Sequence, residues 1–199
     1  MKAIILAAGY ATRLHPLTLD QPKPLLKVGS KPIIEHILKK IEKIETIGQV
    51  FIVTNEKFYS NFLEWREGFK TRLDVEVIND GTTCNEDRLG AIGDINFVIK
   101  TQNIRSDLLI VGGDNLFEEE LKSFVSFFKE KGSSILLNDV NSTELAKLYG
   151  IVSLDENNQI TNFIEKPEMP ESTLASTLVY ALRKEHLPVI NETIELGKA

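Results

Sequence analysis

The first candidate for chemistry is a loop of small residues that is followed by two cations. Ala7-Ala8-Gly9 come directly after the run from Ala3 to Leu6, whose apolar composition is typical of a strand buried on both faces. Residues with little or no side chain let the backbone approach a flat or anionic ligand. Arg13 and Lys23 add two positive charges behind the loop. The pattern indicates a cradle for a polyphosphate; the alternative is a tight turn with two ordinary surface cations.

The second candidate is a carboxylate at the end of another apolar run. Asp114 follows Leu108-Leu109-Ile110-Val111 and two glycines. Proteins hold Mg²⁺ with one or two carboxylates together with phosphate oxygens, so Asp114 is a candidate ligand. The alternative role is to cap the next helix. Ligands of parallel sheets bind at the carboxyl ends of the strands, and for this reason Gly9 and Asp114 can face one site.

Length, composition and charge exclude several classes of protein. The 199 residues are 42% apolar and 26% charged, which is ordinary for a soluble globular domain. A net charge of −6 with scattered lysines and arginines argues against a nucleic-acid surface. No apolar run reaches the roughly 20 residues that a membrane helix needs. Cys84 is the only cysteine, which excludes an internal disulfide and favours a reducing cytoplasm.

Strands and helices alternate up to about residue 140, which predicts an α/β fold with a largely parallel, doubly wound sheet and helices on both faces. The predicted strands are 3–6, 49–53, 73–78, 108–111 and 134–137. The predicted helices are 33–44 behind a Ser30 cap, 56–69, 88–100 and 118–131.

The pattern changes after Leu145. Two strands around a turn are predicted at 149–154 and 159–164, a further strand at 174–182, and a helix from Leu187 that stops near Gly197. Because no repeat, low-complexity tract or linker interrupts the chain, we expect a single domain over residues 1–199.

The complete N-terminal string is more specific than its parts. Leu6-Ala7-Ala8-Gly9, Thr12-Arg13-Leu14 and Pro22-Lys23-Pro24-Leu25-Leu26 together resemble the sugar nucleotidyltransferases, which join a nucleoside triphosphate to a sugar 1-phosphate and release pyrophosphate. The resemblance implies a Rossmann-like three-layer α/β/α fold with a largely parallel mixed sheet. It also implies that Leu6, Ala7, Ala8 and Gly9 bind the nucleotide, and that Arg13 and Lys23 are catalytic residues that neutralise the phosphates. Many members have glycine where this chain has Ala11, whose methyl group disfavours a positive φ.

Three later motifs extend the resemblance. Gly113-Asp114-Asn115 is similar to the family's Gly-Asp-x motif, which implies that Asp114 is a catalytic residue and the Mg²⁺ ligand. Residues 79–91 resemble the base-recognition loop, and the nucleotide-binding residues implied there are Asn79, Gly81, Asn85, Leu89 and Gly90. Tyr149-Gly150 and Glu165-Lys166-Pro167 resemble the sugar half of the site. The implied sugar-phosphate-binding residues are Tyr149, Gly150, Glu165, Lys166 and Thr177, beside Leu178, where glycine is common in the family.

One element of the family pattern is missing. Members carry a second metal-binding aspartate in a late Trp-x-Asp-x-Gly segment, and nothing after Thr177 matches it, because no Asp occurs there and Trp65 is the only tryptophan. We therefore expect an amino-terminal portion of a longer protein, which lacks its C-terminal part, binds nucleotide and transfers it weakly or not at all.

The resemblance implies a cytoplasmic, Mg²⁺-dependent enzyme that uses a nucleoside triphosphate, with dTTP or UTP favoured, and a sugar 1-phosphate. Glucose-1-phosphate thymidylyltransferase is the most similar subclass. One alternative is a cytidylyl- or guanylyltransferase that acts on phosphocholine or mannose 1-phosphate. Another is a non-catalytic regulatory subunit that binds a nucleotide-sugar. We expect no nucleic-acid or membrane partner, and a homo-oligomer is compatible with the sequence. The residues name neither the base nor the sugar.

Overall fold

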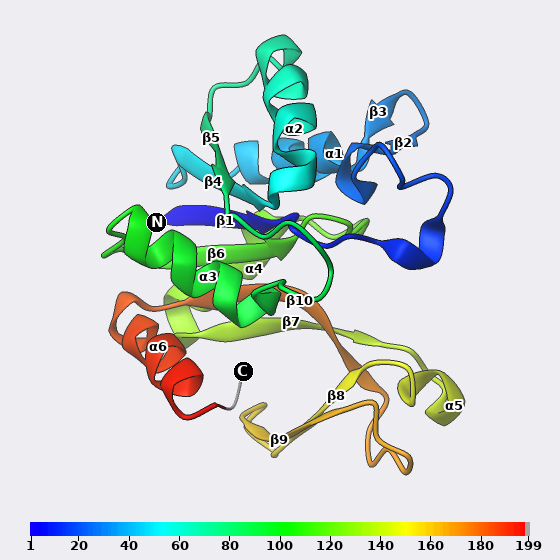
Figure 1. The fold of residues 1–199 in the computed structure, drawn as a ribbon. Helices are drawn as coiled ribbons and strands as arrows, with labels where there is room; N and C mark the ends of the chain where they lie inside the picture. The colour runs from blue at the N-terminus through cyan, green and yellow to red at the C-terminus, as the bar shows by residue number, and fades with distance from the viewer. Residues whose placement is uncertain (198–199) are drawn as a thin grey trace. The chain divides into compact units, whose positions relative to one another are not determined.

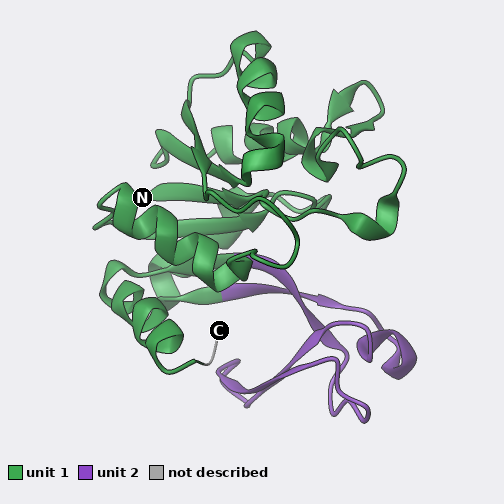
Figure 2. Ribbon diagram, viewed as in Figure 1, with its two compact units in different colours: residues 1–134, 180–199 green, residues 135–179 purple. Residues whose placement is uncertain are grey.

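A computed structural model describes residues 1–197 and divides the chain into two compact units (Figures 1 and 2). The larger unit consists of Met1–Ser134 and the chain from Tyr180 onward, and the smaller unit of Ile135–Val179. Each unit is described by itself below. None of the helices in the described residues combines the length and the apolar content that crossing a membrane would require.

The larger unit is built on a parallel sheet whose central strand is β1 (Lys2–Leu6). β1 lies between β4 (Gln49–Thr54) and β6 (Leu108–Gly112), and β5 (Asp74–Asn79) lies beyond β4. All three pairings are parallel. The apolar runs of β1, β4 and β6 are buried because helices cover the sheet. The prediction of a largely parallel sheet is confirmed for these strands.

Within residues 1–197, five helices of eight or more residues pack around this sheet. They are α1 (Ile33–Glu42), α2 (Glu56–Gly68), α3 (Gly90–Thr101), α4 (Leu121–Lys131) and α6 (Leu187–Glu195). α3 packs against β1 and against α6, and Figure 1 shows both helices on the near side of the sheet. Ile4 of β1, Val98 of α3 and Leu187 of α6 belong to one buried cluster on that side. α1 packs against α4.

The start of α1 corrects a prediction. Ser30 does not cap the helix, because it lies in the turn of a short antiparallel hairpin between β2 (Lys27–Val28) and β3 (Lys31–Pro32). Gly29, at φ +66°, supplies the left-handed residue that such a turn requires. The helix begins directly after Pro32, whose backbone is extended.

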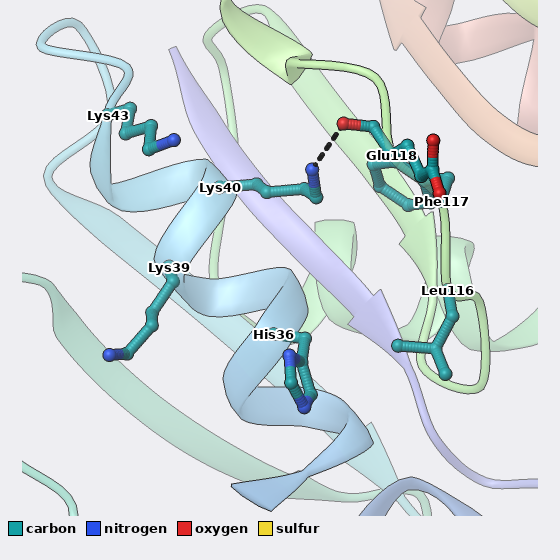
Figure 3. A pocket seen from close by; sticks show the side chains of 7 residues that line it. All are labelled: His36, Lys39, Lys40, Lys43, Leu116, Phe117 and Glu118. Carbon is teal, nitrogen blue, oxygen red and sulfur yellow. Dashed lines mark hydrogen bonds between the residues drawn. The ribbon is translucent and has the colours of Figure 1, made fainter. Parts of the chain in front are cut away.

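The start of α4 also differs from the predicted position 118. The helix begins at Leu121, because the backbone before it makes tertiary contacts instead of helical ones. Lys40 of α1 donates from Nζ to the Glu118 carbonyl oxygen at 2.8 Å (Figure 3). It also donates to the Glu119 carbonyl oxygen at 3.0 Å. The Lys43 ammonium pairs with the Glu120 carboxylate at 2.7 Å. These contacts join α1 to the segment that leads into α4.

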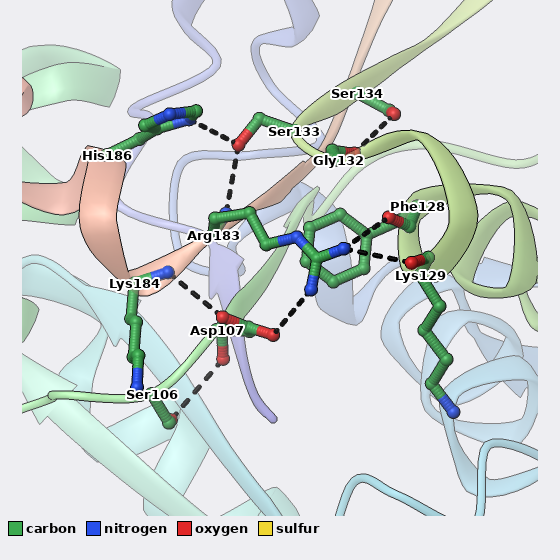
Figure 4. A network of polar contacts seen from close by, with 10 residues as sticks. All are labelled: Ser106, Asp107, Phe128, Lys129, Gly132, Ser133, Ser134, Arg183, Lys184 and His186. Atoms are coloured by element: carbon green, nitrogen blue, oxygen red, sulfur yellow. Dashed lines mark hydrogen bonds and ion pairs between the residues drawn. The ribbon is translucent and has the colours of Figure 1, made fainter.

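The segment after β10 (Leu174–Leu182) is fixed to the larger unit by a polar network (Figure 4). The Arg183 guanidinium lies over the Phe128 ring at 4.7 Å, and the Asp107 carboxylate accepts from the Lys184 backbone N–H at 3.0 Å. The Ser133 hydroxyl accepts from the Arg183 backbone N–H and contacts Nδ1 of His186 at 2.7 Å. This network places α6 against α3, and it gives His186 a structural position.

The smaller unit is mostly antiparallel. β8 (Gly150–Leu154) pairs with β9 (Ile160–Glu165) and with β10, and β7 (Ser134–Asp139) also pairs with β10. The predicted change of pattern after residue 145 is therefore confirmed. Its core is small, and consists of Ala146, Ile151 and Ala175 with Val140 against them. The four-residue helix α5 (Thr143–Ala146) was not predicted.

Candidate active site

The carboxyl ends of β1 and β6 approach each other so closely that only glycine fits at one position. The Gly113 backbone N–H donates to the Leu6 carbonyl oxygen at 2.8 Å. A Cβ atom at Gly113 would lie 2.7 Å from that same oxygen, a distance that Cβ atoms do not tolerate. The glycine before Asp114 therefore brings this carboxylate to the edge of the sheet where the loop after β1 begins.

The loop after β1 is held from the neighbouring strand. The Ala7 backbone N–H donates to the Val53 carbonyl at 2.8 Å, and the Asn55 side chain donates to the Ala8 carbonyl at 2.8 Å. The Asn55 side-chain oxygen also accepts from the Phe58 backbone N–H at 3.1 Å and caps α2. The sequence prediction left Asn55 without a role, between the strand at 49–53 and the helix at 56–69. An asparagine between a buried strand and a helical pattern was the available signal for a cap.

The turn at Ala11 keeps the conformation that glycine favours. Ala11 has φ 47° and ψ 40°, in the left-handed region, and its carbonyl accepts from the Thr18 hydroxyl at 2.8 Å. An L-residue in this region costs about 1–2 kcal/mol. The buried Thr18 side chain helps to hold the turn, so the replacement of glycine leaves the loop's left-handed turn in place.

Lys23 and Asp114 are brought together although 91 positions separate them. The Lys23 Nζ atom lies 2.6 Å from Oδ2 of Asp114, and the side chains are 35% and 44% exposed. An ion pair at this exposure contributes about 0–1 kcal/mol to stability. The contact therefore does little for the fold and leaves both charges accessible to a ligand.

Arg13 lies on the short 3₁₀ turn Thr12–Leu14. Its side chain is exposed and makes no hydrogen bond or ion pair that is recorded among residues 1–197. Asp114 is not a helix cap, because α4 begins at Leu121 with Glu120 before it. The capping alternative for Asp114 is therefore wrong, and its carboxylate is engaged by Lys23 alone among the recorded ion pairs of the described chain.

The side chains present can bind Mg²⁺ only if a phosphate and water supply the remaining ligands. Within residues 1–197 no group of three or more His, Cys, Asp or Glu side chains is arranged to hold a metal. One exposed carboxylate, Asp114, is the type of ligand that Mg²⁺ combines with phosphate oxygens and water. The residues present are thus compatible with a metal that arrives with a triphosphate.

The loop from residue 79 to residue 90 is organised by short side-chain turns. The Asn79 side chain accepts from the Gly81 backbone N–H at 2.9 Å and donates to the Glu56 carboxylate. Asp87 accepts from the Thr83 and Cys84 backbone N–H groups, at 3.0 Å each in the shorter contacts, and these bonds lower the pKa of its carboxyl. The loop is therefore ordered without a helix or strand of its own.

The other residues expected to bind the nucleotide lie in this loop or at its C-terminal end. The Asn85 side chain accepts from the Arg88 guanidinium at 2.7 Å. Leu89 is 43% exposed, and Ile92 is also exposed. Gly81 and Gly90 have φ +81° and +75°, values that glycine adopts readily. Leu89 and Gly90 stand at the start of α3.

The expected sugar-phosphate residues gather on one hairpin of the smaller unit. Gly150 of β8 pairs with Glu165 of β9, and the Lys166 backbone N–H donates to the Tyr149 carbonyl at 2.9 Å. The Lys166 ammonium lies 3.4 Å from the Glu165 carboxylate. Lys166 has φ +47°, which turns the chain directly after β9.

Thr177 lies apart from this hairpin, on β10. Its hydroxyl donates to the Leu136 carbonyl of β7 at 2.7 Å. The next residue, Leu178, has φ +56°, so it occupies the left-handed conformation that the glycine common at this position would adopt without strain. The sugar-phosphate role of Thr177 and of the hairpin residues stays a prediction.

A cavity of about 460 Å³ lies elsewhere in the larger unit, between α1 and the segment after Asp114 (Figure 3). Its lining residues are His36, Lys39, Lys40, Lys43, Leu116, Phe117 and Glu118. None of the predicted site residues lines it. Two of its three lysines, Lys40 and Lys43, are already bonded to the segment before α4, so this cavity is not the predicted cradle.

A substitution at Gly9 tests phosphate binding by the loop after β1 without disturbing the fold. A Cβ atom built on Gly9 would meet no atom within 4 Å, and its φ is not positive. We expect Gly9→Ala to change the free energy of unfolding by less than about 0.5 kcal/mol. If the backbone approaches phosphate, the added methyl should lower triphosphate affinity by about tenfold or more.

Calorimetric titration together with urea unfolding measures both effects. Gly48→Ala is the matched control, because Gly48 also has open space around its Cβ position and lies before β4, away from the loop. Equal triphosphate affinity in Gly9→Ala and Gly48→Ala would remove the backbone of Gly9 from the binding site.

Comparison with known proteins places this geometry in a family. The model of a family described as "Nucleotidyl transferase" matches residues 2–197. The bifunctional protein GlmU of Methanococcus maripaludis is 33% identical over 187 residues, which are 92% of this chain and 40% of that protein. The UTP–glucose-1-phosphate uridylyltransferase of Synechocystis is 30% identical over 200 residues, 96% of this chain and 51% of that protein. The chain thus spans about half or less of the length of these relatives.

A solved structure shares the fold. A protein of Bacillus anthracis described as a glucose-1-phosphate thymidylyltransferase, crystallised with sucrose, superposes with a TM-score of 0.82 at 24% identity, over 96% of this chain and 75% of that one. The predicted Rossmann-like α/β fold is confirmed by this likeness and by the parallel sheet. From the match over residues 2–197, the chain belongs to the nucleotidyl transferase family.

Proposed function

We propose that this chain carries the nucleotide site of a sugar-1-phosphate nucleotidyltransferase. In this reaction a phosphate oxygen of the sugar 1-phosphate attacks the α-phosphorus of a nucleoside triphosphate. A new phosphorus–oxygen bond forms, the bond between the α- and β-phosphates breaks, and pyrophosphate leaves with the electron pair. Because both reactants are polyanions, the protein must neutralise charge and align them, and no covalent nucleophile is needed.

The single observation that carries this proposal is the contact between Lys23 and Asp114 at the carboxyl ends of β1 and β6. A cation, which attracts phosphate oxygens, and a carboxylate, which attracts metal cations, meet there beside a loop of small residues. Lys23 is suited to bind phosphate oxygens, and Asp114 is suited to bind a cation that accompanies them.

Each residue then has a stated task. The backbone of Leu6, Ala7, Ala8 and Gly9 approaches the nucleotide, while Arg13 and Lys23 neutralise the phosphates. When bound, Mg²⁺ supplies further neutralisation of the phosphates, and Asp114 is the side chain that would hold it. On binding, phosphate oxygens compete with the Asp114 carboxylate for the three N–H donors of Lys23.

The similar proteins indicate which base and which sugar we favour. A uridylyltransferase and a protein described as a thymidylyltransferase are among them, so we favour UTP or dTTP with glucose 1-phosphate. Location in the cytoplasm and assembly as a homo-oligomer belong to the same proposal and rest on the family alone.

The test is pyrophosphate release by the purified protein with Mg²⁺, across UTP, dTTP, CTP and GTP and across glucose 1-phosphate, mannose 1-phosphate and phosphocholine. The expected result is release with UTP or dTTP that requires glucose 1-phosphate. Release only with CTP and phosphocholine, or only with GTP and mannose 1-phosphate, would favour the alternative transferases. Binding of a nucleotide-sugar without turnover of any of these substrates would favour the regulatory subunit.

A further inference from the structure

Two buried carboxyl groups lie together beneath the loop of residues 79–90, and the proposed function uses neither of them. Asp80 directly follows β5 and is 9% exposed, and Asp94 lies on α3 and is 6% exposed. Oδ2 of Asp80 and Oδ1 of Asp94 are buried without a hydrogen-bond partner within residues 1–197. Buried carboxyl groups are costly unless they are paired or neutralised, so this pair calls for a physical role.

Asp80 holds the turn that opens the loop. Its Oδ1 atom accepts from the Thr82 backbone N–H at 2.7 Å and from the Thr82 hydroxyl at 2.7 Å. Its own backbone N–H donates to the Thr54 carbonyl at 2.8 Å, which continues the pairing of β5 with β4. The position of Thr82 therefore depends on the Asp80 carboxylate and on where that carboxylate is directed.

Thr82 connects this turn to the cradle after β1. The Tyr10 hydroxyl donates to the Thr82 hydroxyl at 3.5 Å, and Tyr10 follows Gly9 in the chain. The Thr82 carbonyl accepts from the Glu56 backbone N–H at 3.0 Å, at the start of α2. A movement of Asp80 would therefore shift both the loop of residues 79–90 and, through Tyr10, the loop after β1.

Asp94 can hold Asp80 only with a proton. Two buried carboxylates in contact repel each other, whereas a protonated carboxyl donates a hydrogen bond to its ionised neighbour. Burial, followed by the charge of Asp80 and a hydrogen bond with it, raises the pKa of Asp94 to about 8. The charged group that acts on Asp94 is Asp80. Asp80 also acts on the Tyr10 hydroxyl, as do Asp87 and Cys84 of the facing loop.

We propose that Asp94 is a positioning residue, which in its protonated form donates to Asp80 and thereby holds Thr82 and the base loop in the binding conformation. The binding part of this inference rests on the proposed function, and the part that concerns the stability of the folded protein does not.

The direction of the pH dependence follows from linkage. The folded state raises the pKa of Asp94 above the value of about 3.9 that an aspartate has in an unfolded chain. The stability that Asp94 contributes is therefore fully present below that value, and it is lost as the pH rises through about 8. If only the protonated protein binds triphosphate, its affinity falls by up to about tenfold per pH unit above 8.

Asp94→Asn separates the proton from the shape of the side chain. The asparagine amide donates a hydrogen bond at every pH and cannot ionise. Asp94→Leu keeps the branching at Cγ, at a larger volume, but removes the donor and leaves the Asp80 oxygen buried without a partner. Asp74→Asn is the control for removing an aspartate charge near this sheet, because Asp74 lies exposed at the other end of β5.

Urea unfolding midpoints and calorimetric triphosphate affinities of all four proteins between about pH 6 and about pH 9.5 test the proposal. We expect the original protein and Asp74→Asn to lose stability progressively up to about pH 8, where the loss levels off, and to lose affinity above about pH 8. Asp94→Asn should keep both, and Asp94→Leu should be weakened at every pH. The same pH profile in Asp94→Asn as in the original protein would overturn the proposal, as would an Asp94→Asn protein that is as weak as Asp94→Leu.

The two proposals fail in different ways. A pH dependence of unfolding that differs between the original protein and Asp94→Asn supports the role of Asp94 as a proton donor to Asp80, even where no triphosphate binds to any of the proteins. The absence of triphosphate binding would overturn the proposed function. Triphosphate binding with unfolding profiles that do not separate would overturn the role of Asp94 and leave the proposed function standing.

Discussion

Arg13→Ala is expected to lower the rate of pyrophosphate release by about 10²–10³-fold, because it removes one fixed positive charge from a site where charge must be neutralised during transfer. Triphosphate affinity should fall by about 10- to 100-fold, the range for a charge-assisted hydrogen bond. Stability should not change, since the Arg13 side chain is exposed and has no recorded partner among the described residues.

The measurement combines turnover with calorimetric titration of Mg²⁺ and triphosphate, so that a weakly active chain still gives a result. Arg105→Ala is the matched control, because Arg105 is also exposed and its guanidinium bonds only to the nearby Asn103 side chain in the recorded contacts. Equal affinities and rates in the two variants would show that Arg13 is an ordinary surface cation, the alternative that its sequence left open.

Asp114→Asn is expected to change triphosphate affinity in opposite directions with and without Mg²⁺. Without metal, the variant lacks one negative charge, and Lys23 loses the ion pair that it makes with Asp114 at 2.6 Å in the original protein. Removal of one repulsive charge at about 4 Å in water-like surroundings is worth about 1 kcal/mol, so affinity should rise about fivefold. With Mg²⁺, the variant loses the metal ligand, and affinity and turnover should fall by more than about tenfold.

Titrations of triphosphate into the original protein and into Asp114→Asn, in EDTA and in Mg²⁺, measure this reversal. Asp107→Asn is not a suitable control, because Asp107 holds the segment after β10. Asp20→Asn is suitable, since Asp20 is exposed and lies on the same N-terminal segment as Lys23. A change of the same sign in both conditions would count against Asp114 as a metal ligand.

The sequence predicted the parts of the fold that depend on local pattern. The apolar runs Ala3–Leu6 and Leu108–Val111 were predicted to be buried strands, and β1 and β6 contain them. The boundaries of β10 agree with the predicted strand at 174–182. Ala11 was expected to disfavour a left-handed turn, and the structure keeps that turn with the help of Thr18.

The parts that were missed depend on contacts between distant residues. Nothing near Lys23 in the sequence indicates that it pairs with a residue 91 positions away. Asp94 on α3 is a charged residue of a type that is usually solvated, yet it is buried, whereas the apolar Leu89 and Ile92 are exposed. The hairpin at residues 27–32 was missed because two-residue strands carry no periodicity.

The central claim is that the loop after β1, Lys23 and Asp114 hold one triphosphate and its metal. Its most direct test is an NMR titration of the labelled protein with triphosphate and Mn²⁺ in place of Mg²⁺, in which amides near the paramagnetic ion lose their signals. We predict that the first losses occur together at Ala7–Arg13, at Lys23 and at Gly113–Asn115. First losses at the cavity lined by His36, Lys39 and Lys43, or at scattered surface amides, would contradict the account.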